Sequence, residues 1–406
     1  MSTPSPDTAI RSDSRTSSGP VRALAVTTTI VAVLLILFVV PWWTLVLSGT
    51  RWPAPVVALG TSAFAIALVV LPVTLVLSHG RRHLDWAGMI GDSILGIVWV
   101  LFAWSVIGTV ARLGLAFVGV EDPVRSRSVA TAVVLVTAVL LIWGNREAMR
   151  IPRIKHVDVT LPRLGPGLDG TRVVAVTDTH FGPINRTKWS LGVAAAVNEL
   201  RPDIVAHVGD IADGPVELRR GQAAPLATME AGLARVCVTG NHEYLGEAQG
   251  WLDYMESIGW KTLHNEHIVV ERGGDRLVLA GVDDATAKSA KLSGHGANFD
   301  DALAGVDPGL PVLMLAHQPK QVFESAAAGV DLQIAGHTHG GQIWPFNYLV
   351  RLDQPTVHGL SRHGERTQLY TSRGSGFWGP PFRIFAPSEI TVITLHSVRP
   401  AGPACV

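Results

Sequence analysis

The sequence predicts a bundle of apolar membrane-spanning helices followed by an α/β domain with a parallel β-sheet. Two observations support this fold class. Hydrophobic residues make up 48% of the chain and charged residues 16%, and the apolar excess lies mainly in the first third. Such a composition is too apolar for a purely soluble protein. In the rest of the chain, short apolar runs end in polar turns at intervals of roughly 30 residues, the length of one strand–helix–strand unit.

The first 20 residues are rich in Ser, Thr and Pro with almost no large apolar side chains, so we expect them to be disordered. A signal peptide is the alternative, because Arg22 precedes a hydrophobic run. That run is too long for the apolar part of a signal peptide and further apolar segments follow it, which favours a retained membrane anchor.

Four segments form the predicted membrane region, 21–147. Each approaches the roughly 20 residues that cross a hydrocarbon core. They cover about 23–47, 54–78, 93–111 and 129–144. Asp92 precedes the third segment, and because an uncharged span fits after it, we expect Asp92 at the interface rather than inside the membrane. The apolar stretch 113–120 is too short to cross and is also expected in the interface.

Basic residues in the short loops predict the orientation of these helices, because cytoplasmic loops carry more Lys and Arg. With four spans, both termini share one face. That face carries Arg11, Arg15, Arg22, Arg81, Arg82, Arg146, Arg150, Arg153 and Lys155, and the other carries Arg51, Arg112, Arg125 and Arg127. We therefore predict a multi-pass protein of the cell membrane whose C-terminal domain lies on the cytoplasmic face of the lipid bilayer.

Charge and cysteine spacing argue against two other classes of protein. The formal net charge is +0 and there is no basic stripe or aromatic RNA-binding motif, so nothing indicates nucleic-acid binding. The two cysteines, Cys237 and Cys405, match neither a disulfide framework nor a zinc-binding pattern. Cys237 is expected to be a small core residue.

Three apolar runs after residue 154 are expected to form parallel strands, each followed by a polar turn. The run 173–176 leads to Asp178 and His180, 204–208 leads to Asp210 and Asp213, and 234–238 leads to Asn241 and His242. Helix-like stretches, 188–200 and about 224–233, separate them. In a parallel βαβαβ arrangement, functional residues gather beyond the carboxyl ends of the strands, where all three polar turns fall.

Further strands are expected downstream, at 268–271 and 277–282 and then at 311–315 and 330–335. The last two lead to His317 and to the pair His337 and His339. The tail segments 368–372 and 389–395 alternate apolar and polar residues as antiparallel strands do.

The pair His337 and His339 lies in a turn bracketed by Gly336 and Gly340. Alternate residues of a strand point to opposite sides, so two imidazoles on a regular strand cannot easily serve one metal ion. Glycine lets the chain turn at the end of the strand. The two histidines can then serve two adjacent metal ions.

Seven polar side chains at these strand ends form a candidate set of metal ligands: Asp178, His180, Asp210, Asn241, His317, His337 and His339. One carboxylate shared between two cations partly neutralises both, and Asp210 is the candidate bridge. Two such cations lie roughly 3.5–4 Å apart, lower the pKa of a bridging water and bind a phosphoryl oxygen. Imidazole, carboxylate and amide ligands without a thiolate suit Mn, Fe or Zn.

Each of these residues also has a purely structural explanation. Asp178, Asp210 and Asp213 fit helix N-caps, a lone His317 fits a buried core histidine, and Asn241 fits a turn residue. Capping does not account for the histidines, whose gathering at strand ends favours a metal site. A core position is expected for His207, inside a strand, and surface or loop positions for His264, His267, His295, His358 and His363.

The ordered motifs resemble those of the calcineurin-like metallophosphoesterases, in particular their bacterial membrane-associated branch. They are Asp178-x-His180, Gly209-Asp210-x-x-Asp213, Gly240-Asn241-His242-Glu243, His317 and Gly336-His337-x-His339-Gly340-Gly341-Gln342, with Gly374-x-Gly376 and Pro387-x-Glu389-Ile390 in the tail. The resemblance implies a domain over 154–398, followed by a C-terminal tail, 399–406. Its fold would be two mixed β-sheets packed as a sandwich and flanked by helices.

By the same resemblance, one divalent metal ion is held by Asp178, His180, Asp210 and His339, and the other by Asp210, Asn241, His317 and His337. His242 would stand beside the metals, where it stabilises phosphoryl oxygens or protonates the leaving group as a general acid. Asp213 would orient His242, because a carboxylate on one ring nitrogen keeps an imidazolium protonated.

The implied function is a membrane-anchored phosphoesterase with two divalent metal ions, in which a metal-bridging hydroxide hydrolyses a phosphate mono- or diester. The alternative is a membrane receptor or regulator whose domain binds a ligand without turnover. A protein phosphatase ranks lower, because Gly214 and Pro215 follow Asp213 where that class has Arg-Gly.

Two features bear on the substrate. The segment 285–299, with Lys288, Lys291 and His295, is either a lid over an anionic substrate or, more simply, a solvated loop. Five aromatic residues flank the metal turn and the tail and are candidates for an apolar rim facing lipid or a nucleoside: Trp344, Phe346, Phe377, Trp378 and Phe382. A phospholipid or a nucleotide-linked lipid beside the bilayer is therefore a candidate substrate.

Overall fold

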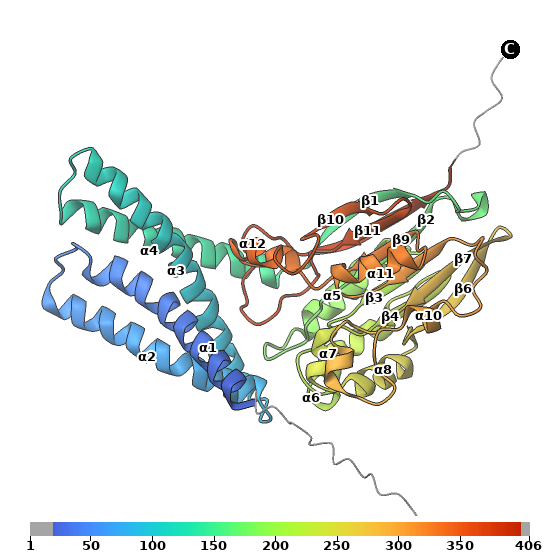
Figure 1. Cartoon of the computed structure of the whole chain (residues 1–406), viewed down its shortest axis with the longest axis horizontal. Helices are drawn as coiled ribbons and strands as arrows, with labels where there is room; N and C mark the ends of the chain where they lie inside the picture. Colours follow the sequence, from blue (N-terminus) through green and yellow to red (C-terminus); the bar gives the residue numbers. More distant parts are fainter. Residues whose placement is uncertain (1–18, 399–406) are drawn as a thin grey trace, which may run out of the picture.

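The computed structural model describes residues 19–398. Four long helices form one end of the molecule and an α/β domain forms the other (Figure 1). The N-terminus predicted to be disordered and the tail 399–406 lie outside the described residues, except that residues 19 and 20 already belong to the first helix.

The four helices are α1 (Gly19–Trp42), α2 (Ala54–His79), α3 (Asp85–Phe117) and α4 (Val124–Met149). A π-helical turn, Trp43–Leu47, continues α1 just after Pro41, whose missing N–H disturbs the helical hydrogen bonds. All four helices are long and apolar enough to cross a membrane, as predicted. The stretch 113–120 contains the last turn of α3, which ends at Phe117, and the turn at Gly119, which has a φ of 83°. Its position at the membrane interface stays a prediction.

The first β-sheet has the strand order β1-β12-β2-β3-β4-β5. Its strands are β1 (Arg153–Thr160), β2 (Thr171–Val176), β3 (Ile204–Val208), β4 (Ala234–Val238), β5 (Lys261–Thr262) and β12 (Glu389–His396). The pairs from β2 to β5 are parallel, with Val174 beside Val205 and Ala206 beside Val236. β12 is antiparallel to β2 and parallel to β1. The predicted parallel βαβαβ unit is therefore present.

The second sheet has the order β10-β11-β9-β8-β7-β6. Its strands are β6 (Glu266–Arg272), β7 (Asp275–Gly281), β8 (Val312–Leu315), β9 (Leu332–Ala335), β10 (Gly359–His363) and β11 (Thr367–Thr371). The strands β7, β8, β9 and β11 are parallel, and β6 and β10 pair antiparallel at the two edges. The two tail strands, β11 and β12, therefore belong to different sheets, and each has one parallel and one antiparallel neighbour.

The core lies between the two sheets. Alternate residues of the strands meet there: Ile204, Ala206 and Val208 of β3 share a buried cluster with Leu313 and Leu315 of β8. The intervening Val205 faces the opposite way, against α5 (Thr187–Glu199) and α8 (Ala248–Ser257). The domain is therefore a sandwich of two mixed sheets with helices outside, as the resemblance implied.

One predicted helix is misplaced. The sequence suggested a helix at about 224–233, but the helix is α6, Val216–Ala223, and a 3-10 turn, Ala224–Thr228, follows it. Pro225 explains the error, because proline disfavours helical geometry at the residue before it and cannot continue the α-helical hydrogen bonds. The predicted helix 188–200 matches α5.

Helices α3 and α4 pack directly on the α/β domain. Val100 of α3 shares a buried cluster with Ile343, Phe382 and Ile384. The indole N–H of Trp99 donates to the backbone oxygen of Ile343 over 3.2 Å. The short helix α12 (Phe346–Val350) lies at this contact, between the long helices and the sheets (Figure 1). The membrane helices and the domain thus share one interface.

Candidate metal centre

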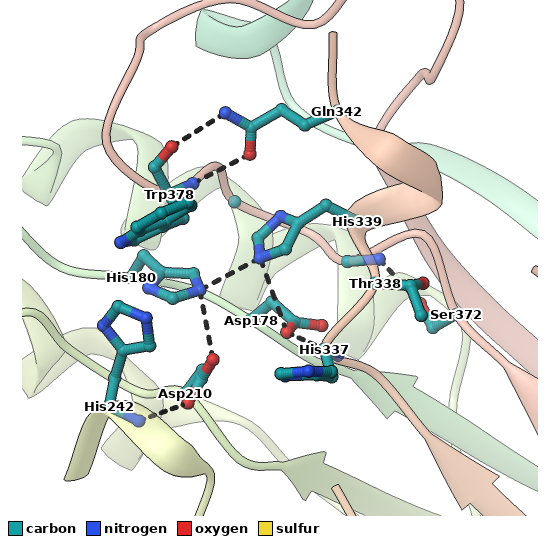
Figure 2. Close-up of polar contacts among 12 residues, drawn as sticks. Asp178, His180, Asp210, His242, His337, Thr338, His339, Gln342, Ser372 and Trp378 are labelled. Carbon is teal, nitrogen blue, oxygen red and sulfur yellow. Dashed lines mark hydrogen bonds and ion pairs between the residues drawn. The ribbon is translucent and has the colours of Figure 1, made fainter. Parts of the chain in front are cut away.

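All seven predicted ligands lie at one edge of the sandwich, beyond the carboxyl ends of the strands. Asp178 and His180 follow β2, Asp210 follows β3, Asn241 begins α7 (Asn241–Leu245) after β4, His317 follows β8, and His337 and His339 follow β9. Figure 2 shows the side chains of Asp178, His180, Asp210, His337 and His339 pointing toward one another. Both sheets therefore contribute to a single site.

One group of ligands contains Asp178, His180 and His339, whose donor atoms lie within 4.8 Å of one another. The Nε2 atoms of His180 and His339 are 3.0 Å apart. Nε2 of His339 is 3.6 Å from Oδ1 of Asp178. These three side chains can share one cation.

The second group contains Asp210, His317 and His337. Oδ2 of Asp210 is 3.1 Å from Nε2 of His317 and 3.4 Å from Nε2 of His180. Oδ1 of Asn241 is 3.2 Å from Nε2 of His317 and 2.8 Å from Nδ1 of His337. The carboxylate of Asp210 thus lies between the two groups, where a bridging ligand belongs, and the two histidines of the glycine-bracketed turn go to different groups.

The backbone is strained at the ligand positions. Five ligands have a φ between 42° and 69°: Asp178, His180, Asp210, His337 and His339. Residues other than glycine rarely adopt this region, and such strain concentrates at functional sites, where the surrounding structure holds it. The Asp residues do not cap helices, because α5 and α6 begin after Arg186 and Pro215. The capping explanation is therefore wrong.

Glycines of the motifs make room for neighbouring ligands. A Cβ atom at Gly240 would overlap Oδ1 of Asp210, and one at Gly336 would overlap Oδ2 of Asp178. A Cβ atom at Gly209 would lie 2.5 Å from Nδ1 of His317. The glycines in the motifs thus allow segments from different strands to approach closely.

The donor set fits divalent cations. Oδ2 of Asp178 is buried and has no hydrogen-bond partner among the described residues, a state that buried carboxylate oxygens otherwise avoid. Burial lowers the pKa of His337 to about 3, and burial together with the nearby His180 and Arg383 lowers the pKa of His339 well below its ordinary value. Both imidazoles are therefore neutral at physiological pH, the form that binds metals. With imidazole, carboxylate and amide donors, this is a site for divalent metal ions.

His242 and Asp213 lie next to the seven ligands, and His242 places a donor atom within 4.8 Å of those of His180 and Asp210. Oδ1 of Asp213 is 2.8 Å from Nδ1 of His242 and also 2.8 Å from Nδ1 of His180. Burial opposes a positive charge on His242, but the carboxylates of Asp210 and Asp213 outweigh it and raise its pKa to about 9. His242 is thus protonated at neutral pH. Asp213 contacts both this histidine and a predicted metal ligand, a second contact that the motif did not indicate.

Two buried charged residues at the site were not predicted. The carboxylate of Glu243 accepts hydrogen bonds from the N–H groups of Gly240, Asp210, Ile211 and Ala212 at 2.7–3.3 Å. It thereby joins the loops after β3 and β4. Arg383 is fully buried, and its guanidinium donates to the carbonyls of Gly376 and Arg373 at 2.8 Å and lies 3.1 Å from Nδ1 of His339. The motif contained Glu243 without its role, and nothing in the sequence near Arg383 indicated burial.

A second cluster lies apart from the seven ligands. His264, His295 and Asp283 place donor atoms within 4.8 Å of one another, and the side chain of His295 is 2% exposed. Nδ1 of His295 lies 3.1 Å from the hydroxyl of Tyr244. Both histidines lie in loops, as predicted: His264 precedes β6, and His295 lies between α9 (Ala287–Ala290) and α10 (Phe299–Ala302). Their rings pack on the buried carboxylate of Asp283. His207 is buried, as predicted.

The aromatic rim is only partly present. Trp378 is 42% exposed and its ring lies 5.8 Å from that of His242. Phe377 and Phe382 are buried, and Trp344 and Phe346 contact Trp104 and Trp99 of α3. Four of the five aromatics thus serve the contact with the membrane helices or the interior. Of the five, Trp378 is the one that stands beside His242.

Comparisons with known proteins indicate the family of this chain. Residues 171–341 match the family model "Calcineurin-like phosphoesterase". A Danio rerio protein, "Transmembrane protein with metallophosphoesterase domain", is 37% identical over 76% of this chain and 74% of the relative. The Bos taurus protein of the same name is 35% identical over 73% of this chain and 67% of the relative. A Helicobacter pylori protein, "Uncharacterized metallophosphoesterase", is 35% identical over 62% of this chain and 66% of the relative.

The matches to the first two relatives are longer than the α/β domain alone, so they extend into the region of the apolar helices. The fold, the ligand geometry and these similarities point to the same assignment. The chain is a membrane protein that belongs to the calcineurin-like metallophosphoesterase family.

Proposed function

We propose that this protein is a membrane-anchored phosphoester hydrolase that works with two divalent metal ions. One observation carries the proposal. Donor atoms from five separate strand ends meet around the carboxylate of Asp210, within 3.1–3.4 Å of histidines that come from different sheets. When bound, two such cations lower the pKa of a water molecule to supply the nucleophile and neutralise the phosphoryl oxygens.

The residues of the site would divide the work. Asp178, His180 and His339 would hold one cation, and Asn241, His317 and His337 the other, with Asp210 shared. His242 would hold a proton for the leaving oxygen, because a carboxylate neighbour raises its pKa to about 9 and general acids act in the protonated form. Asp213, 2.8 Å from Nδ1 of His242, would keep the other ring nitrogen facing the substrate.

A lipid-linked phosphoester is the substrate class that the surroundings favour. The site is joined to the membrane helices through α3 and α4, and Trp378 offers an exposed indole beside His242. Indole rings favour the boundary between headgroups and hydrocarbon. The phosphate of a lipid headgroup lies at this boundary, so it would reach the site while its acyl chains stay in the bilayer.

The test uses the full chain purified in detergent. We expect close to two transition metal ions per chain and hydrolysis of an aryl phosphate mono- or diester after reconstitution with manganese. Asp210→Ala and His337→Ala should lose metal and lower kcat/KM by more than about 100-fold, the upper range for residues outside the ligand shell. Asp300→Ala, an exposed carboxylate on α10 (Phe299–Ala302), is the matched control.

Two outcomes would contradict the proposal. Bound metal without turnover on mono-, di- and lipid-linked phosphoesters would favour a receptor or regulator that only binds. Unchanged activity in Asp210→Ala would show that hydrolysis comes from elsewhere. Comparing phospholipids and nucleotide-linked lipids with soluble esters in the same preparation tests the substrate class.

We also propose that the α/β domain faces the cytoplasm of the cell. The support is the basic excess on the face that holds both termini. Cys237 cannot report this orientation, because it is 1% exposed. Single cysteines at Glu230 of the domain and at Val118 between α3 and α4, both exposed, should label with an impermeant maleimide from opposite sides. Labelling of Glu230→Cys in intact cells would reverse the orientation.

A further inference from the structure

The N-terminal end of membrane helix α3 forms an ion pair with the α/β domain in which only the arginine is buried. Asp85 is the first residue of α3, and Arg219 lies on α6. Two nitrogens of the Arg219 guanidinium donate to the two carboxylate oxygens of Asp85, at 2.6 and 3.0 Å. The side chain of Arg219 is 4% exposed and that of Asp85 49%. This paired geometry fixes the orientation of the guanidinium as well as its position.

The same guanidinium reaches the edge of the metal centre. Its Nε donates to the backbone oxygen of Asp213 over 2.9 Å. The carboxylate of Asp213 in turn lies 2.8 Å from both His180 and His242. A continuous series of contacts therefore runs from Asp85 through Arg219 and Asp213 to a predicted metal ligand and to the predicted general acid.

A second, independent observation places α3 at the site. Met89 and Asp92 of α3 line a pocket whose other walls include His180, Gly182 and Asp213. A Cβ atom at Gly88 would lie 2.6 Å from the ring of Pro183, so α3 touches the loop after His180. Asp92, which the sequence placed at the interface, is 4% exposed and lies 3.1 Å from Nε2 of His79. The membrane helix is thus one wall of the pocket beside the metal centre.

We propose that Asp85 and Arg219 are positioning residues of the phosphoesterase site: through the backbone of Asp213, they set the positions of His180 and His242. This inference rests on the proposed function. Its consequence is that the α/β domain reaches full activity only when α3 is docked on it. The membrane helices are then part of the catalytic apparatus and not merely an anchor.

The chemistry of the two side chains makes the proposal specific. Arg219 uses its Nε for Asp213 and its two terminal nitrogens for Asp85, and lysine cannot make this pattern because it has a single nitrogen. Outer contacts of metal ligands typically change metal affinity or activity about 10–100-fold. Small displacements of catalytic groups have effects of a similar size.

The experiment compares four variants of the full chain in detergent: Asp85→Asn, Asp85→Glu, Arg219→Lys and the control Asp122→Asn. Asp122 lies between α3 and α4, at the other end of α3, and forms an ion pair of 2.6 Å with Arg125 of α4. We expect kcat for a soluble aryl phosphate to fall about 10–100-fold in Asp85→Asn and Arg219→Lys, with KM changed less than about threefold. Asp85→Glu, which keeps the charge, should recover most of the loss, and Asp122→Asn should match the parent protein.

Metal affinity, measured by competition with a chelator, gives a readout that does not need turnover. Because Asp213 also contacts His180, Asp85→Asn should bind metal about tenfold more weakly than Asp122→Asn. If the parent protein hydrolyses no phosphoester, the proposed function fails, but this affinity difference still supports the positioning role. Equal metal affinity and kcat in Asp85→Asn and Asp122→Asn would overturn it. So would equal losses in both, which would indicate a general effect on folding.

Discussion

The membrane helices and the β-sandwich use the same apolar residues in opposite ways. On α2, Leu59 is 74% exposed, Val69 65% and Val76 72%, whereas all five residues of β3 are buried. The helices turn valine and leucine outward because their surroundings are lipid, and their backbone hydrogen bonds are satisfied within each helix. The sandwich turns the same side chains inward, away from water.

The difference shows where the two parts depend on each other. The helices have exposed apolar surfaces that lipid can cover, but α3 and α4 also bury side chains against the domain, at Val100, Ile343 and Ile384. The domain places its polar network at the edge nearest these helices. The contact between the membrane helices and the α/β domain therefore lies next to the metal centre. Four experiments test how far the helices and the domain each tolerate a change.

The largest effect is expected within the sandwich, at Glu243. It is 1% exposed and accepts four backbone hydrogen bonds. Glu243→Ala leaves these N–H groups buried without partners, at about 1–3 kcal/mol for each group lost, so the free energy of unfolding should fall by at least about 3 kcal/mol.

Glu247→Ala provides the control. Glu247 is exposed and accepts one backbone hydrogen bond, from Val216, so this change should cost less than about 1.5 kcal/mol. Denaturant unfolding of the detergent-solubilised proteins, followed by tryptophan fluorescence, measures both. Equal stability of the two variants would contradict a role for Glu243 in joining the loops.

The next effect concerns the interface. A Cβ atom at Gly96 of α3 would lie 2.6 Å from the ring of Phe382, whereas Gly114 of the same helix has no described heavy atom within 4 Å of that position. Gly96→Leu should separate α3 from the domain at a cost of up to about 3 kcal/mol, and limited proteolysis between Met149 and Arg153 should speed up. Gly114→Leu should leave the cleavage rate unchanged. Similar rates in both would mean that the interface is loose.

A smaller effect is the dependence of stability on pH that comes from the buried His207. Burial lowers the pKa of His207 to about 3 from its ordinary 6.5. Between these values the unfolded chain binds a proton that the folded chain does not, so stability rises as the pH increases from 3 to 6.5 and is constant above. His207 should therefore make the protein about 2 kcal/mol less stable at pH 5 than at pH 8. The variant His207→Leu should lose this part of the pH dependence, and an unchanged slope would contradict it.

The smallest effect leaves stability unchanged. Burial raises the pKa of the Cys237 thiol, which is 1% exposed, so the reactive thiolate is scarce in the folded protein. A maleimide should modify Cys237 only when the sandwich unfolds, while a cysteine at exposed Glu230 reacts at once. Rapid labelling of native Cys237 would mean that the sandwich opens locally.

The fold was predictable where the pattern of apolar residues was strong. The four helices and the strands β2, β3 and β4 stand out because long or repeated apolar runs mark them. Three strands were missed for physical reasons. β1 is mostly exposed and carries charged residues, β10 is an edge strand, and β5 has two residues, so none has an apolar run.

The candidate ligands were predictable because each motif follows a strand, and parallel strands bring their carboxyl ends to one edge. Contacts between distant elements were not. Arg219 and Arg383 gave no sign of burial, since buried arginines depend on partners that lie far away in the sequence. The paired contacts of Asp213 and the cluster of His264, His295 and Asp283 likewise depend on how the loops meet.

The division of the metal centre between two sheets has a consequence for how the protein matures. The first sheet contributes Asp178, His180, Asp210 and Asn241, and the second contributes His317, His337 and His339. If these residues hold the metal ions as proposed, neither sheet alone holds a complete set, and tight metal binding would follow the packing of the two sheets against each other. Bound metal ions would then stabilise the packing of the two sheets against each other, and removing them with a chelator should weaken this packing before it affects either sheet.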